Sequence, residues 1–114
     1  MGDQPPALSE YQGMWLFAMF DLPVDTKEAR RDYTQFRKVL LKEGFTMLQY
    51  SIYARYYGSE EASIPQRNRV RGSLPPDGQI RLMLVTDHQF GKMEVFLGKS
   101  RRPTETPPKQ LLLF

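Results

Sequence analysis

MWLFAMFD, residues 14–21, is the stretch from which the architecture of this 114-residue chain can be worked out. Its first seven side chains are apolar, at odd and even positions alike. Neighbouring side chains of a strand point to opposite faces of a sheet, so a strand with one wet face alternates apolar and polar residues. This stretch does not alternate, and it therefore predicts a central strand that is covered on both faces.

The segment that follows predicts an amphipathic helix over residues 26–43. Asp25 offers an N-cap, and Glu28 stands three residues on as the second half of a capping box. Gly44 is a typical helix stop. One stripe of this helix has the apolar spacing of a face packed on a core, with Ala29, Tyr33, Phe36 and Leu40.

The rest of the chain adds strands and one more helix. Residues 46–57 alternate between two faces and are rich in aromatic side chains, which predicts one long strand. A second helix is expected over residues 59–71, and the Pro-Pro-Asp-Gly sequence at residues 75–78 predicts a turn. Further strands are expected at residues 79–87 and 93–97.

We expect an α+β fold of the ferredoxin-like type, βαββαβ, with both helices on one face of a four-stranded antiparallel sheet. We expect residues 1–13 to form a flexible N-terminal extension and residues 14–98 to form the domain. Residues 99–114 are expected to be a linker with an apolar tail. That tail, Leu111–Phe114, would add a strand-like segment at a sheet edge or dock on a partner.

The first strand also predicts a homodimer. One of its two side-chain sets has to meet something other than the chain's own helices, because exposing three such side chains costs about 1.5–3 kcal/mol each. The economical cover is a second copy, sheet against sheet, in a twofold dimer, and a bound ligand is the competing cover. We expect the interface set to be Trp15, Phe17 and Met19.

The composition excludes several kinds of site. The chain has no cysteine and one histidine, His88, so disulfides, thiolate zinc sites, cysteine nucleophiles and two-histidine designs within one chain are excluded. Its longest apolar run has seven residues, far short of the roughly 20 of a membrane helix. We therefore expect a cytoplasmic protein with no membrane partner. The net charge of +3 suggests a polyanionic partner.

Asp21 is the candidate for chemistry, because it ends the apolar strand on the side that carries Trp15, Phe17 and Met19. If a twofold axis passes near this strand end, two copies of Asp21 come together. Two close carboxylates favour a hard cation such as Mg²⁺, which could activate water against a phosphodiester. The alternative is that Asp21 caps the turn at Leu22-Pro23.

The first helix carries a candidate surface for nucleic acid. Six basic side chains fall on one arc opposite the apolar stripe: Lys27, Arg30, Arg31, Arg37, Lys38 and Lys42. Such an arc could track a phosphate backbone. The alternative is a solvated helix face, although such faces usually carry both signs of charge.

Several pieces of the sequence occur in a particular combination. They are the apolar strand closing on Asp21, the Phe-Asp-Leu-Pro corner at residues 20–23, Gly44-Phe45 followed by LQYSIY at residues 48–53, PPDG at residues 75–78 and LVTD at residues 84–87. Together these pieces resemble the small CRISPR-associated Cas-two family over about residues 14–98.

The resemblance implies a ferredoxin-like homodimer that works in the acquisition of new spacers. In that role the dimer bridges copies of the partner integrase, of the Cas-one family, and holds the incoming double-stranded DNA. The family is also described as a metal-dependent endonuclease on RNA or DNA. In that account the strand-end aspartate, here Asp21, binds Mg²⁺ with its twin at the dimer interface. Ser51 and Arg55 match family positions near that site.

Two departures from the family pattern favour the scaffold over the nuclease. Phe20 stands where many nucleolytic members have a tyrosine, and Thr46-Met47 stands where some have a basic residue. The first hypothesis is therefore a DNA-binding scaffold with a latent Mg²⁺-dependent phosphodiesterase activity at the dimer interface. The alternative is a toxin-like, metal-dependent endoribonuclease that acts on its own. A small-molecule-binding regulatory module is the third, and only the architecture supports it.

Overall fold

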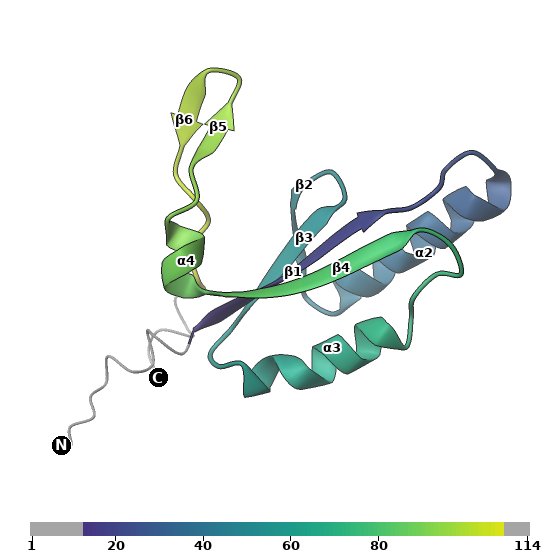
Figure 1. Cartoon of the computed structure of the whole chain (residues 1–114), viewed down its shortest axis with the longest axis horizontal. Helices are drawn as coiled ribbons and strands as arrows, with labels where there is room; N and C mark the ends of the chain where they lie inside the picture. The colour runs from purple at the N-terminus through teal and green to yellow at the C-terminus, as the bar shows by residue number, and fades with distance from the viewer. Residues whose placement is uncertain (1–12, 109–114) are drawn as a thin grey trace.

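The structure is a computed structural model that describes residues 13–108 (Figure 1). The predicted N-terminal extension, apart from Gly13, and the predicted apolar tail Leu111–Phe114 lie outside the described residues. Within residues 13–108, no helix has the length and apolar character needed to cross a membrane.

β1 (Met14–Asp21) is the central strand that its sequence predicts. It pairs antiparallel with β3 (Ile52–Tyr57) on one side and with β4 (Gln79–Thr86) on the other. β2 (Thr46–Gln49) pairs with β3 at the edge, which gives the strand order β2-β3-β1-β4. This α+β arrangement with a four-stranded antiparallel sheet is compatible with the predicted ferredoxin-like fold.

Two helices cover one face of this sheet, which we call the helix face (Figure 1). They are α2 (Lys27–Lys42) and α3 (Ile64–Arg71), and a single 3-10 turn, η1 (Glu61–Ser63), leads into α3. Phe36 and Leu40 of α2 pack in one core cluster with the even-numbered side chains of β1. The odd-numbered side chains of β1 therefore lie on the opposite face, which we call the outer face.

The ends of α2 are fixed by its own capping residues. Thr26, and not the predicted Asp25, is the N-cap, because the Thr26 side chain accepts a hydrogen bond from the Ala29 backbone N–H. At the other end Gly44 adopts a φ of 89°, as predicted for a helix stop. The backbone N–H groups of Gly44 and Phe45 return to the carbonyls of Leu41 and Leu40, the pattern of a Schellman cap.

Two predicted strand boundaries were wrong. Residues 46–57 form two strands and not one, because Ser51 takes a left-handed φ of 63° and turns the chain between β2 and β3. The strand expected at residues 93–97 is β5 (Val95–Leu97), and it pairs with β6 (Ser100–Arg102) in a hairpin separate from the main sheet. β6 lies within the stretch predicted to be a linker. Figure 1 shows this hairpin projecting from the body of the molecule.

The outer face is covered at one end by the chain itself. The short helix α4 (Asp87–Gly91) places the Phe90 ring parallel to the Trp15 ring, with 4.0 Å between their centroids. Trp15 and Phe17 are only 6% and 8% exposed. The expectation that these two side chains need a second copy to cover them was wrong, because the cover comes from a residue 75 positions along the same chain. Met19 remains half-buried, and the homodimer stays a prediction.

Candidate functional site

Asp21 lies at the end of β1, where it faces Gln79 of β4 across the sheet. Its side chain is exposed on the outer face and lines an open depression of about 290 Å³. The predicted turn before β4 holds this end of the strand in place. Gly78 has a φ of 96°, and a Cβ built on it would lie 2.8 Å from the Asp21 carbonyl oxygen. Only glycine allows the turn to approach β1 this closely.

Ser51 lies close to Asp21, as the family resemblance implies. The Ser51 carbonyl accepts a hydrogen bond from the Phe20 backbone N–H at 3.0 Å, which ties the β2–β3 turn to β1. The Ser51 and Tyr33 hydroxyl oxygens are 3.2 Å apart, so α2 also holds the turn. Ser51 and Asp21 line the same depression, which we call the Asp21 depression.

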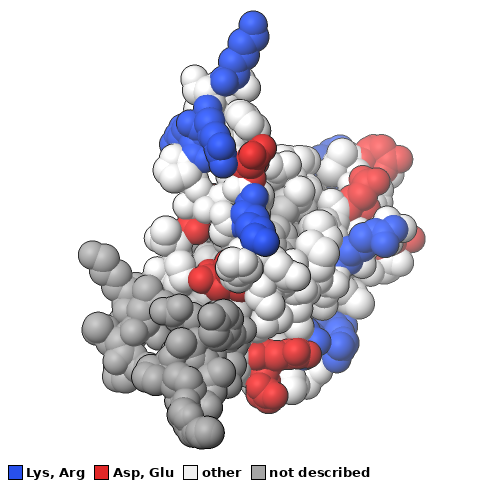
Figure 2. All heavy atoms as spheres, turned by 60° about the vertical axis from the view of Figure 1, so that its left-hand side comes forward, with Lys and Arg blue, Asp and Glu red and all other residues white. Residues whose placement is uncertain are grey.

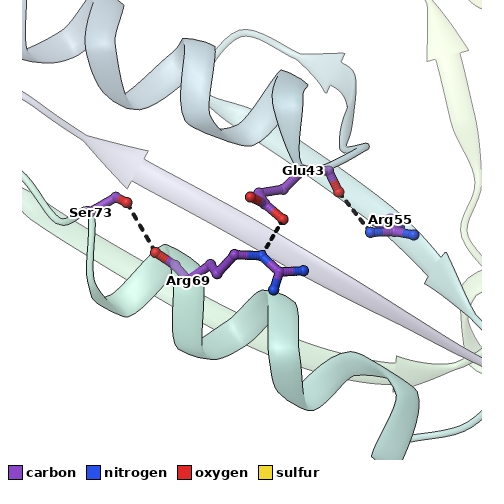
Figure 3. Close-up of polar contacts among 4 residues, drawn as sticks. All are labelled: Glu43, Arg55, Arg69 and Ser73. Atoms are coloured by element: carbon purple, nitrogen blue, oxygen red, sulfur yellow. Dashed lines mark hydrogen bonds and ion pairs between the residues drawn. The ribbon is translucent and has the colours of Figure 1, made fainter.

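Arg55 does not lie near Asp21, and its predicted placement was wrong. It faces Leu16 in the register of β3 and β1, five positions and about 17 Å along the strand from Asp21. It also lies on the helix face, where its Nη1 donates a hydrogen bond to the Glu43 carbonyl at 2.7 Å (Figure 3). The Arg55 guanidinium carbon stands 4.8 Å from the centre of the Tyr57 ring.

Glu43 also joins the end of α2 to α3. The Arg69 Nε donates to Glu43 Oε1 at 2.7 Å, while the Arg69 carbonyl accepts from the Ser73 hydroxyl (Figure 3). Arg55 and Arg69 therefore hold α2, α3 and β3 together through Glu43. This contact explains Arg55 as a structural residue with no part in the Asp21 depression.

The basic arc predicted on α2 is exposed along its whole length. All six side chains are exposed: Lys27, Arg30, Arg31, Arg37, Lys38 and Lys42. Two of them also make local contacts, since Arg30 donates to the Val24 carbonyl and Arg37 donates to the Tyr53 hydroxyl. No ion pair within residues 13–108 neutralises any of the six. The arc can therefore meet an anionic partner.

A second basic surface lies on the β5–β6 hairpin. Figure 2 shows lysine and arginine side chains gathered on the projecting hairpin, above a face with few charges. Lys99, Arg101 and Arg102 come from this hairpin, and Arg101 lies 3.8 Å from Glu94 in an exposed ion pair. Exposed pairs of this kind contribute little to stability, so these cations stay available in solution.

The residues at Asp21 do not make a metal site within one chain. In the described part of the chain, no group of three His, Cys, Asp or Glu side chains could hold a metal ion. Asp21 is the one carboxylate among the residues that line its depression. The predicted Mg²⁺ would therefore need ligands from outside the chain, and a second copy with its own Asp21 is the source that the sequence predicts.

The sequence matches the family model described as CRISPR associated protein Cas2 over residues 14–93. This match covers every element of the main sheet and both of its helices. The chain belongs to the CRISPR-associated Cas2 family.

Curated Cas2 relatives match over nearly the whole chain. The CRISPR-associated endoribonuclease Cas2 of Parvibaculum lavamentivorans is 48% identical over 89% of this chain and 100% of its own length. The protein of the same name from Flavobacterium psychrophilum is 45% identical over 94% of this chain and 93% of its own length. That of Paracidovorax avenae is 39% identical over 94% of this chain and 99% of its own.

Three residues that line the Asp21 depression were not among the residues predicted from the sequence. Tyr50, Gln79 and Arg81 line the Asp21 depression with Asp21 and Ser51. Gln79 and Arg81 could have been predicted to lie on one face of the sheet, because they stand two residues apart on the strand expected at residues 79–87. Tyr50 carried no such signal, because the pattern of residues 46–57 predicts one continuous strand and gives no sign of the turn in which Tyr50 lies.

Proposed function

We propose that this Cas2-family chain forms a homodimer that binds double-stranded DNA and bridges the Cas-one-family integrase during spacer acquisition. The observation that carries the proposal is the basic arc of α2, six exposed cations of one sign on one side of a single helix. The acidic residues of α2 lie outside this arc. A helix face that contacts only water usually carries both positive and negative side chains, so this separation of charges favours an anionic partner.

The dimensions of the arc suit a phosphate backbone. A helix of 16 residues is about 24 Å long, and one DNA strand carries a phosphate about every 3.4 Å, so α2 can follow several phosphates. Phosphate contacts require only lysine and arginine side chains. The proposal therefore needs no chemistry from Asp21.

Charge reversal on α2 tests this proposal. A variant with Arg30→Glu, Arg31→Glu and Lys38→Glu should lose blunt-duplex binding in fluorescence anisotropy. The milder Arg31→Gln variant should lower the slope of log affinity against log salt by about 0.9, the value for one lost phosphate contact. Arg71→Gln is the control, because Arg71 is an exposed cation at the end of α3 and lies outside the arc. Duplex binding that stays unchanged in the triple variant would overturn the proposal.

The alternative function is a metal-dependent endoribonuclease that acts on its own. Two observations favour it as a second candidate: the three relatives above are named endoribonucleases, and Asp21 is exposed in an open depression. Asp21 from each of two copies would hold Mg²⁺, and such an ion activates water against a phosphodiester. One chain alone lacks the ligands, so this function depends on the dimer.

One substitution distinguishes the two proposed functions. Asp21→Asn keeps the size of the side chain and removes its charge, so it should abolish Mg²⁺-dependent cleavage of a labelled RNA while duplex binding stays at the wild-type level. If cleavage survives in Asp21→Asn, the endoribonuclease assignment at this site is wrong. If duplex binding is lost as well, Asp21 belongs to the DNA-binding surface.

A further inference from the structure

The loop between α3 and β4 contains the only Asp-Gly pair of the sequence, Asp77-Gly78. Both residues are exposed, and they lie in a bend that no backbone hydrogen bond closes within the described residues. Gly78 directly precedes Gln79, the first residue of β4, which pairs with Asp21. A chemical change at this pair therefore acts on the strand end that carries Asp21.

Two groups of the pair are free to react with each other. No ion pair or side-chain hydrogen bond within residues 13–108 holds the Asp77 carboxyl group. The Gly78 backbone N–H also has no partner in this part of the chain. Because Gly78 has no side chain, nothing on that residue hinders the approach of the Asp77 carboxyl group to the Gly78 nitrogen.

The loop has no room for a longer main chain at this point. A Cβ built on Gly78 would lie 2.5 Å from Leu22 Cδ2 and 2.8 Å from the Asp21 carbonyl oxygen. These distances are well inside the optimal separation of about 3.5–4.0 Å between non-bonded carbon atoms. Gly78 therefore cannot move toward β1 without displacing Asp21 and Leu22.

We propose that Asp77-Gly78 is a site of spontaneous aspartate isomerisation, and that conversion of Asp77 to isoaspartate loosens the strand end that carries Asp21. In the first step the Gly78 nitrogen forms a bond to Asp77 Cγ, the Cγ–OH bond breaks, and the hydroxyl leaves with the amide proton as water. The product is a cyclic succinimide. Water then opens the ring, and breakage of the bond from nitrogen to Cγ restores aspartate. Breakage of the bond from nitrogen to the Asp77 main-chain carbonyl carbon gives isoaspartate.

The modification acts through geometry and not through charge. In isoaspartate the main chain runs through Cβ and Cγ, so it becomes longer by one methylene group directly before Gly78. The side group is still a carboxylate, and the net charge does not change. Since Gly78 is packed against Asp21 and Leu22, the longer loop has to disturb the pairing of Gln79 with Asp21. The inference does not depend on the proposed function, because the basic arc of α2 lies on another element.

Mass spectrometry of aged protein tests the site. The folded full chain is incubated in heavy-oxygen water at neutral pH and physiological temperature, and residue 77 is compared with Asp25 in the same sample. Asp25 is also exposed, but it is followed by Thr26, whose side chain hinders ring closure. Each opening of the ring adds heavy oxygen, so both the label and isoaspartate at residue 77 should exceed those at Asp25 many times over. Asp77→Glu keeps the charge but requires a larger ring that closes more slowly, and the signal should disappear.

Hydrogen exchange tests the structural consequence. In aged wild-type protein the amides of residues 79–81 should exchange faster than in fresh protein, because the start of β4 opens more often. Amides around Trp15, at the other end of β1, should exchange at the same rate before and after ageing. Aged Asp77→Glu should show no change at either end.

Four outcomes would overturn the inference. The first is label at residue 77 that is no higher than at Asp25 in the folded protein. The second is label at residue 77 in the urea-unfolded chain alone, because the fold would then protect the pair. The third is isoaspartate at residue 77 with unchanged exchange at residues 79–81, because the loop would then absorb the added methylene. The fourth is equal label in Asp77→Glu, because the oxygen would then enter without a succinimide.

Discussion

At the Trp15 end of the outer face, Phe90 and Tyr56 surround the indole, and a cavity beside it is lined by Glu105, Thr106 and Pro108. At the other end, only six positions along β1, the same face opens into the Asp21 depression with its tyrosine, arginine, amide and carboxylate. One strand therefore has an outer face that is closed at one end by its own chain and open at the other. The closed end stabilises the fold, and the open end is available for recognition.

This difference changes the argument for the dimer. From the sequence, a second copy was the economical cover for the odd-numbered apolar side chains of β1, with a bound ligand as the competing cover, but Trp15 and Phe17 are buried without either. What remains for a partner to cover is the Met19 end, next to Asp21. A homodimer of this chain would therefore meet through the open end, where two copies of Asp21 could lie together.

Removal of the intramolecular cover should have the largest effect. Phe90 is 2% exposed and stacks on Trp15, so Phe90→Ala should lower the free energy of unfolding by about 3–5 kcal/mol. Urea denaturation followed by tryptophan fluorescence measures the loss. Phe96→Ala is the matched control, because Phe96 is 56% exposed and its loss should cost less than about 0.5 kcal/mol. Equal effects of the two substitutions would show that α4 does not cover β1.

The polar contact at the closed end should have the next largest effect. Trp15 Nε1 donates a hydrogen bond to Asp87 Oδ1 at 2.7 Å, and removal of this acceptor leaves a buried N–H without a partner. Asp87→Ala should therefore lower the free energy of unfolding by about 1–3 kcal/mol, and Asp87→Asn, which keeps an oxygen acceptor, should lose less. Thermal denaturation of both variants decides this order. If Asp87→Asn lowers the free energy of unfolding as much as Asp87→Ala does, the charge of Asp87 matters more than the hydrogen bond.

Alkaline pH should weaken the closed end by a smaller amount. Burial, and then the negative charge of Asp87, raise the pKa of Tyr56 above its usual value near 10. A folded pKa above the unfolded pKa means that stability is constant below about pH 10 and falls as the pH rises further. Unfolding free energies between pH 8 and alkaline pH should show this fall, and Tyr56→Phe should reduce it. A Tyr56→Phe curve that falls as steeply as wild type would contradict this assignment.

Substitution at the open end should have the smallest effect on stability. Asp21 is exposed and lies in no ion pair within residues 13–108, so Asp21→Asn should change the free energy of unfolding by less than about 0.5 kcal/mol. Denaturation at low protein concentration measures this. A larger loss would mean that Asp21 caps the turn at Leu22-Pro23, the structural alternative that the sequence leaves open.

Much of the main sheet could be predicted from the sequence because local patterns determine it. The unbroken apolar run of β1, the stripe on α2, the helix stop at Gly44 and the turn at Gly78 all reflect residues close together in the chain. The family resemblance assigned Asp21 and Ser51 to one site, and the two residues line the same depression.

The features that could not be predicted depend on distant contacts or on single backbone angles. Phe90 covers Trp15 across 75 positions of sequence, and no periodicity marks such a pair. The turn at Ser51 depends on one left-handed residue that is not glycine, so no glycine or proline indicated it. Arg55 was placed near Asp21 by resemblance, although its distance of four residues from Ser51 along a strand, about 13 Å, already argued against that placement.

Quenching of Trp15 fluorescence tests most directly the claim that the chain covers its own strand. Trp15 is the single tryptophan of the sequence, so its emission reports on this one site. Acrylamide quenching of the full chain should be weak and the same from high to low protein concentration, and it should rise in Phe90→Ala. Quenching that increases when the wild-type protein is diluted would show that a second copy provides the cover, and would contradict the account.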